Sequence, residues 1–149
     1  MADLHIDDFY RDVATVLLRL YAVFPRKVTL YVEDIAGPDE PDEFGLHHPR
    51  FQAAFSAAIW LADQGYIYFA DTIRQEALDQ VTLTRQTFLL LASAACEPLT
   101  KPPADDTPPS LIAESMRSIN QLRHALRQGL GPQIRQVVSE LLSRPSIGT

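Results

Sequence analysis

The residues of this chain whose types could support chemistry gather between positions 39 and 48. His47 and His48 follow four carboxylates, and imidazole and carboxylate groups are common ligands of divalent metals. The carboxylates are Asp39, Glu40, Asp42 and Glu43. Adjacent histidines seldom both face one ion, and the stretch lacks the aspartate spacing of a calcium-binding loop. We therefore expect an exposed acidic loop, and a small metal-dependent enzyme is only a remote alternative.

The lone cysteine, Cys96, is the other side chain that could act chemically. A reactive thiolate needs a nearby base or positive charge, and small apolar residues precede Cys96 instead. The six glycines are too scattered for a phosphate-binding loop or a dinucleotide fingerprint, and no serine-nucleophile motif is present. We therefore expect no catalytic residue, no metal, no cofactor and no enzymatic activity, and a protein that acts by binding.

Charge separates the two parts of the chain. Of its 149 residues 46% are hydrophobic and 21% are charged, as in ordinary globular proteins, and the net charge is −6. Up to Cys96 there are 7 Lys and Arg against 14 Asp and Glu, whereas the remainder has 6 against 5. Affinity for a nucleic-acid backbone comes largely from clustered Lys and Arg. DNA is therefore a disfavoured partner, although a local basic patch could still bind it.

The first elements that must position these residues are a helix and a strand. Apolar residues at helical spacing from Phe9 onward predict a helix that Asp7 or Asp8 caps and that Pro25 ends. The β-branched and aromatic run at residues 28–32 predicts a short strand that leads into a turn of helix at residues 33–36.

A second long helix follows an acidic loop at residues 37–45. Pro49 suits the first turn of this helix, which we expect to run to about Gln64 and to end at Gly65. Its expected buried stripe consists of Phe51, Phe55, Ala58, Ile59 and Ala62.

A β-hairpin and a closing helix complete this part of the chain. Residues 66–70 and 80–83 predict the two strands, residues 71–79 form a polar wing between them, and residues 84–93 predict a helix. The runs Trp60–Ile67 and Leu83–Leu91, with the hairpin between them, resemble the winged-helix superfamily of bacterial type. The resemblance covers roughly residues 9–92. It implies an α+β, mostly α fold with a short β-hairpin wing, but the tight turn before the second long helix is missing.

Prolines separate this part of the chain from a C-terminal helical segment. Residues 97–110 contain five prolines and predict a semi-rigid, extended linker. Beyond it, residues 111–128 and 133–143 each carry an apolar stripe at helical spacing and predict a helical hairpin. The sequence thus predicts a winged-helix domain at 1–96, a linker at 97–110 and a helical segment at 111–149.

The candidate contact residues lie on the second long helix, on the wing and on the C-terminal helices. A DNA reader would project Arg, Lys, Asn or Gln from the N-terminal half of the helix, whereas small apolar residues suit a protein partner. The helix candidates are Arg50, Gln52, Ala53, Ser56, Ala57 and Trp60. The wing candidates are Ile73, Arg74 and Leu78, of which Ile73 and Leu78 look exposed and apolar. The C-terminal candidates are Arg117, Arg123, Arg127 and Arg135.

From these features we expect a cytoplasmic adaptor or assembly subunit that binds another protein or a second copy of itself as a homodimer. The alternative is a DNA-binding transcriptional regulator that reads DNA with Arg50, Gln52 and Arg74. No secretory signal opens the chain, and no apolar run has the roughly 18 residues that a membrane span needs. The C-terminal helices could pack on the first domain or on a partner.

Overall fold

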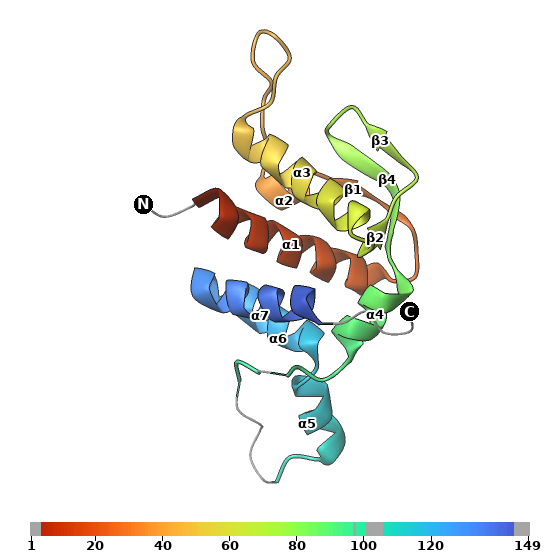
Figure 1. Ribbon diagram of the computed structural model, residues 1–149, viewed down its shortest axis with the longest axis vertical. Helices are drawn as coiled ribbons and strands as arrows, with labels where there is room; N and C mark the ends of the chain where they lie inside the picture. The colour runs from red at the N-terminus through yellow and green to blue at the C-terminus, as the bar shows by residue number, and fades with distance from the viewer. Residues whose placement is uncertain (1–3, 97, 101–105, 145–149) are drawn as a thin grey trace. The chain divides into compact units, whose positions relative to one another are not determined.

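The computed structural model describes residues 4–96, 98–100 and 106–144, in two compact units that meet in the chain between Thr84 and Arg85. The N-terminal unit runs up to Thr84 and the C-terminal unit starts at Arg85 (Figure 1). The N-terminal unit contains α1 (Leu4–Val23), β1 (Val28–Tyr31), α2 (Glu33–Ala36), α3 (Pro49–Asp63), β2 (Ile67–Tyr68), β3 (Asp71–Ile73) and β4 (Ala77–Leu83). The C-terminal unit contains α4 (Arg85–Ala92), α5 (Pro109–Ser115), α6 (Ser118–Gln128) and α7 (Gly131–Ser143).

The described part of the chain is therefore α+β and mostly helical, as the sequence predicts. Its small antiparallel sheet has four strands where the sequence predicts three, because residues 71–73 of the predicted wing also pair with β4. The units divide at residue 84, whereas the sequence placed a domain boundary at residue 96. The difference arises because α4 packs on α6 of the C-terminal unit. That the predicted domains fold independently stays a prediction. No described helix combines the length and apolar character that crossing a membrane requires.

Helix α1 begins earlier than the sequence indicates. It starts at Leu4, so neither Asp7 nor Asp8 is its N-terminal cap. Its apolar face follows the expected spacing, with buried side chains at Val13, Val16, Leu17 and Leu20. Because this face is buried against the rest of the unit, the helix is stabilised by packing along its length.

Helix α3 has the ends that the sequence predicts. Pro49 occupies its first turn, and the Nδ1 atom of His48 accepts a hydrogen bond from the backbone N–H of Arg50. Gly65 follows with φ +84°, the left-handed conformation that glycine adopts most easily. The expected buried stripe is only partly right, since Phe55, Ile59 and Ala62 are half-buried. The buried side chains are Phe51, Ala54, Ala57, Ala58 and Leu61.

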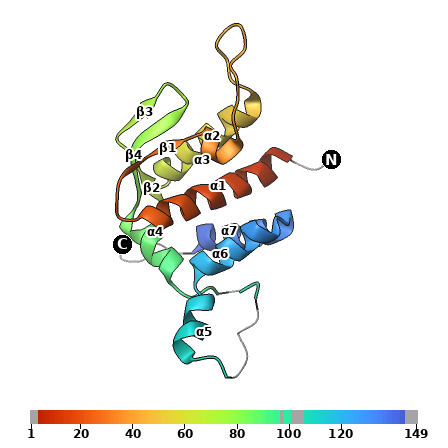
Figure 2. The same ribbon diagram turned by 180° about the vertical axis from the view of Figure 1, so that it is seen from behind.

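The buried face of α3 differs from the expected one because the helix packs on two neighbours. It lies beside α1, and it also contacts α2 (Figures 1 and 2). Val32, Phe51 and Ala54 form a small apolar cluster, against which Phe55 and Ile35 pack. Small residues such as Ala54 let neighbouring helices approach closely. The spacing of large apolar residues in the sequence therefore did not indicate this buried face.

Strand β4 lies at the centre of the sheet, between β1 on one side and β2 and β3 on the other. Residues 67–73 and 77–83 pair in one hairpin, closed by a tip at residues 74–76. β4 carries one extra residue opposite β1, because Val28 pairs with Val81 whereas Leu30 pairs with Leu78. Gln80 lies in this bulge with φ +55°, and it allows Leu78 and Val81 both to face the core.

The C-terminal unit differs from the predicted hairpin in one respect. The single helix expected at residues 111–128 is broken between α5 and α6, where Arg117 is extended. The backbone N–H of Ala95 donates to the carbonyl of Met116, and the N–H of Ser118 donates to the carbonyl of Ser93. This short backbone pairing replaces helical hydrogen bonds, so the helix stops. α6 and α7 then pack together as the expected pair.

Part of the predicted linker, at Leu99 and Thr100, is held by the side chain of Gln121. The buried Gln121 accepts hydrogen bonds at Oε1 from the backbone N–H groups of Leu99 (2.7 Å) and Thr100 (3.2 Å). Its amide nitrogen donates to Thr100 Oγ1 and to the carbonyl of Ser115. α5 also begins inside the predicted linker, at Pro109. The described residues of this stretch are therefore not a plain extended spacer, and residues 97 and 101–105 lie outside the described part.

Candidate functional site

Arg50, the residue most suited to reading a DNA base, is bound within the N-terminal unit. Its Nη1 atom lies 2.8 Å from Asp12 Oδ2 and its Nη2 atom lies 2.5 Å from Asp12 Oδ1. Its Nε atom also lies 3.6 Å from a carboxylate oxygen of Asp8. The Asp12 side chain is only 1% exposed, so water does not solvate its charge. The bidentate contact with Arg50 supplies the counter-charge instead. Arg50 thus joins the start of α3 to α1.

The environment of Asp12 acts on it in two directions. Burial raises the pKa of the Asp12 carboxyl, and the hydrogen bond and positive charge of Arg50 oppose this effect without cancelling it. In return, the hydrogen bond to Asp12 raises the pKa of Arg50. Arg50 remains charged at any physiological pH. Removal of Arg50 would leave the buried carboxyl group of Asp12 without a counter-charge and without contact with water.

The remaining candidates on α3 do not form one open surface. Gln52 Nε2 donates to the carbonyl of His47 at 2.6 Å, while Ala53 and Ser56 are exposed. Ala57 does not lie on the exposed face of α3 where the sequence placed it, because it is 4% exposed and faces the core with Ala54 and Leu61. Its contact with a partner stays a prediction.

Trp60 is partly exposed, but other aromatic rings within the N-terminal unit hold it. It makes an edge contact with Phe9, with ring centroids 5.2 Å apart, and it stacks near Tyr66 at 6.2 Å. Burial raises the pKa of the Tyr66 phenol. Trp60 is therefore part of an aromatic cluster at the rim of the core, with one side open to solvent.

The wing presents a different set of residues from the predicted one. Leu78 is 0% exposed, so the expectation that it looks outward is wrong; it belongs to the core face of β4. Ile73 is exposed, and Arg74 lies at the exposed hairpin tip with φ +58°. Register places Tyr31 and Ile73 on either side of Ala77, so the three form one cross-strand row. Tyr31 and Ile73 are each about half exposed.

The C-terminal arginines lie on the surface of the C-terminal unit. Arg117 Nε lies 2.9 Å from Glu114 Oε2, and Arg123 Nη1 donates to Asn120 Oδ1 at 2.7 Å. Arg127 and Arg135 are exposed. These four side chains come from the break before α6, from α6 and from α7, so they mark basic helix surfaces within this unit.

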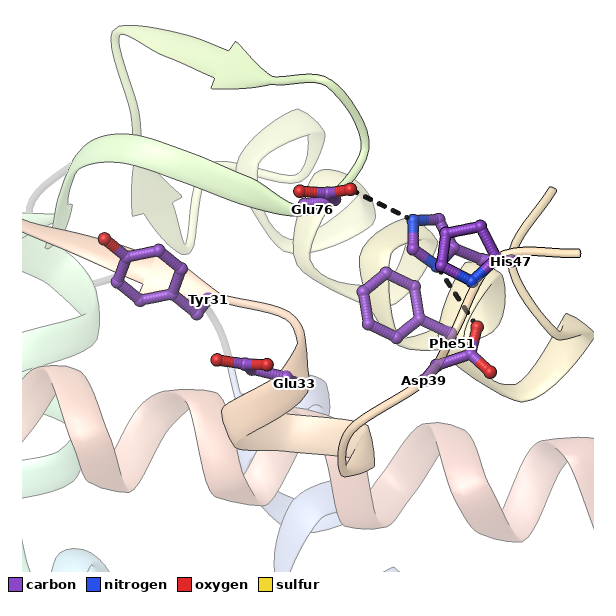
Figure 3. Close-up of a pocket in the computed structure, with 7 residues that line it drawn as sticks. Tyr31, Glu33, Asp39, His47, Phe51 and Glu76 are labelled. Carbon is purple, nitrogen blue, oxygen red and sulfur yellow. Dashed lines mark hydrogen bonds and ion pairs between the residues drawn. The ribbon is translucent and has the colours of Figure 1, made fainter. Parts of the chain in front are cut away.

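A depression of about 270 Å³ lies between the loop before α3, strand β1 and the hairpin tip (Figure 3). Its lining residues are Tyr31, Glu33, Asp39, Pro41, His47, Phe51 and Glu76. Three of these are carboxylates and none is Lys or Arg. The depression therefore suits a cationic or hydrogen-bond-donating group better than a phosphate, because like charges repel.

His47 closes one side of this depression. Its ring stacks on Phe51 with centroids 4.1 Å apart, its Nδ1 lies 3.1 Å from Asp39 Oδ2, and its Nε2 lies 3.4 Å from Glu76 Oε1 (Figure 3). A hydrogen bond from the backbone N–H of His48 is the main cause that lowers the pKa of Asp39, and His47 adds to it. His47 thus ties the loop to the hairpin tip.

The two adjacent histidines have different structural roles, and their rings do not face a common site. His47 contacts carboxylates at the depression, whereas the ring of His48 caps α3. Among the residues that the structure describes, no group of three or more His, Cys, Asp or Glu side chains could hold a metal ion. Cys96 is exposed and its backbone N–H lies 3.4 Å from Glu140 Oε1.

Sequence reasoning missed three residues of this region, which are Asp12, Tyr31 and Glu76. Asp12 was not singled out in the sequence, because its partner Arg50 lies 38 residues away along the chain. Tyr31 and Glu76 meet at the depression because β1 pairs with β4, and this pairing has no local signal. A carboxylate within an otherwise apolar helical stripe was the one hint that Asp12 is buried.

Comparison with known proteins adds no relative. No protein-family model matches the chain, no curated protein matches it, and no solved structure matches it.

Proposed function

We propose that this chain is a non-enzymatic binding module of the winged-helix type that acts as a protein–protein adaptor or as an assembly or regulatory subunit. The winged-helix assignment is supported by the order of the elements, since α3 is followed by a hairpin and β1 pairs on the far side of β4. The one-turn α2 and the loop before α3 stand where the tight turn of a helix-turn-helix would be expected.

The observation that carries the choice of a protein partner is the engagement of Arg50 by Asp12. To reach a base, Arg50 would have to leave a carboxylate that is almost fully buried, and an unpaired buried charge costs several kcal/mol. The amide of Gln52 is also bound to the backbone of its own unit. The start of α3 is therefore poorly supplied with free donors for DNA.

The exposed side chains of the N-terminal unit fit a protein surface instead. Tyr31 and Ile73 are each about half exposed on either side of Ala77 in the sheet, and Phe44 and Leu46 are exposed on the loop before α3. Aromatic residues are enriched in the centres of protein interfaces, where they bury much area at a low cost in entropy. The carboxylates around them repel phosphate. These features support a protein partner that is neutral or basic at the contact.

The test is purification of the full tagged chain, expressed at its native level in the source cell. We expect a second protein to co-elute at a constant molar ratio through size exclusion, or a homodimer to be found by sedimentation equilibrium. The competing regulator would bind duplex DNA at about 50 mM salt, with affinity that falls steeply as salt rises. DNA binding that the surface variant Gln52→Ala/Arg74→Ala abolishes would overturn the adaptor proposal. A monomer that binds neither protein nor DNA would also overturn it.

A further inference from the structure

The loop before α3 exposes two apolar side chains at its tip, residues 42–46. Phe44 is 78% exposed and Leu46 is 60% exposed. The loop projects away from the rest of the N-terminal unit (Figures 1 and 2). When exposed apolar side chains on a projecting loop become buried in a partner, binding gains the free energy of removing them from water. The stability of the N-terminal unit itself does not decrease.

The backbone of the loop tip is held by its own hydrogen bonds. Asp42 Oδ1 accepts from the N–H groups of Phe44 (2.9 Å) and Leu46 (3.0 Å). The N–H of Gly45 donates to the carbonyl of Asp42, and the N–H of Asp42 donates to the carbonyl of Leu46. Gly45 has φ +77°, which permits this tight turn.

The base of the same loop is held as well. Asp39 Oδ2 accepts from the N–H of His48 at 2.8 Å and contacts the ring of His47. A loop fixed at both base and tip presents Phe44 and Leu46 with little further ordering, so less binding free energy is lost on association.

The charge around the tip indicates what it would contact. The segment of residues 37–48 has four carboxylates and neither Lys nor Arg. Asp39 and Asp42 hold the loop itself, and Glu40 and Glu43 are exposed on the same loop as the two apolar side chains. The whole N-terminal unit has 14 Asp and Glu against 6 Lys and Arg, so it would repel the same surface of a second copy and an anionic membrane.

We infer that the loop tip is an anchor that inserts Phe44 and Leu46 into an apolar cleft of a partner protein whose rim carries Lys and Arg. The inference rests on the proposed function, because it assigns the contact and the chemistry of the partner that the adaptor binds. The apolar pair supplies the affinity, and Glu40 and Glu43 speed the encounter and orient it.

The first experiment places a photo-crosslinking amino acid at position 44 of the full chain in the source cell. Gln64 is the matched control position, because it is exposed at the other end of α3, about 20 Å away along the helix. We expect a protein adduct from position 44 and none from position 64, with the crosslinked peptide containing apolar residues next to Lys or Arg. An adduct with a second copy, with lipid or with an acidic peptide would overturn the inference, and so would the absence of an adduct.

The second experiment measures binding of the partner purified by the test above. Phe44→Ala/Leu46→Ala should weaken binding by about 30-fold or more, with an unchanged thermal unfolding midpoint, because both side chains are exposed. Glu40→Lys/Glu43→Lys should slow association about tenfold at low salt and much less at high salt, whereas Asp63→Lys should not. Undiminished binding by the Phe44 and Leu46 variant would overturn the anchor and leave the proposed function standing. A chain that forms neither a complex with another protein nor a homodimer would remove both, whereas a homodimer without another partner would remove the anchor alone.

Discussion

In the N-terminal unit a buried charge joins two helices, whereas in the C-terminal unit buried polar groups hold backbone that has no regular structure. Asp12 and Arg50 connect α1 to α3, both of which are regular helices of 20 and 15 residues. Gln121, by contrast, satisfies the N–H groups of Leu99 and Thr100, which lie in no helix or strand.

Arg144 extends this contrast within the C-terminal unit. Its guanidinium donates to Ser93 Oγ, to the carbonyl of Ala94 and to Ser118 Oγ, and it pairs with Glu140. It thereby holds the chain just after α4 against α6 and α7. The difference teaches that a polar side chain in one unit fixes how helices pack, and in the other it takes the place of missing secondary structure.

The largest effect should follow from breaking the charge pair of the N-terminal unit. Arg50→Met leaves the carboxylate of Asp12 buried without its counter-charge, and we expect the free energy of unfolding to fall by about 3 kcal/mol at neutral pH. Asp12→Leu/Arg50→Met removes both charges and should recover most of that loss. Urea denaturation of the full chain measures all three proteins.

The control for this prediction is an exposed ion pair that joins α1 to α2. Arg19 Nη1 lies 3.9 Å from Asp34 Oδ2, and both side chains are nearly half exposed. Arg19→Met should therefore cost less than about 1 kcal/mol. Equal losses for Arg19→Met and Arg50→Met would show that the burial of Asp12 has no energetic weight.

A smaller effect should follow from removing the amide that holds the C-terminal unit. Gln121→Leu leaves the N–H groups of Leu99 and Thr100 without their acceptor, which should cost about 2 kcal/mol. Hydrogen exchange at those two amides should accelerate. Gln133→Leu is the matched control, because Gln133 Oε1 is buried with no hydrogen-bond partner among the described residues, and it should be neutral or stabilising. The contrast fails if the two leucine variants lose equal stability.

The smallest expected effect is a difference between two aspartates of the N-terminal unit. A ¹³C titration of the carboxyl groups should place the pKa of Asp12 above 3.8 and that of Asp39 below it. Asp39 then contributes stability above pH 3.8 that is lost as the pH falls through its lowered pKa. Asp12 has the opposite sign, so its contribution falls as the pH rises from 3.8 through its raised pKa.

Arg50→Gln sharpens this titration. It removes the group that opposes the effect of burial on Asp12, so the pKa of Asp12 should rise further while that of Asp39 stays the same. Two aspartates that titrate together would contradict the assigned environments.

Local signals in the sequence predicted the parts of the fold that depend on local chemistry. Pro49 and Gly65 mark the ends of α3 because each has a restricted or special backbone conformation. The one-turn helix after β1 and the loop after it were predicted for the same reason.

The features that the sequence did not indicate depend on distant contacts. The helix expected at residues 111–128 breaks at Arg117 because residues 94 and 95 pair with its backbone there. Ala57 and Leu78 were taken as exposed, since their burial depends on which face α3 and β4 turn to the core. Of the candidate site, the acidic loop was predicted, whereas the contact of His47 with Glu76 and the position of Tyr31 at the same depression were not.

The central position of β4 leaves only short strands at the two edges of the sheet. β1 has four residues on one edge, and β2 and β3 have two and three on the other. An incoming strand from another chain would find few free main-chain groups in line on either edge. Recognition by adding a strand to this sheet is thereby limited. Under the proposed function, specificity in the N-terminal unit would rest with side chains that the loop and the sheet face carry outward.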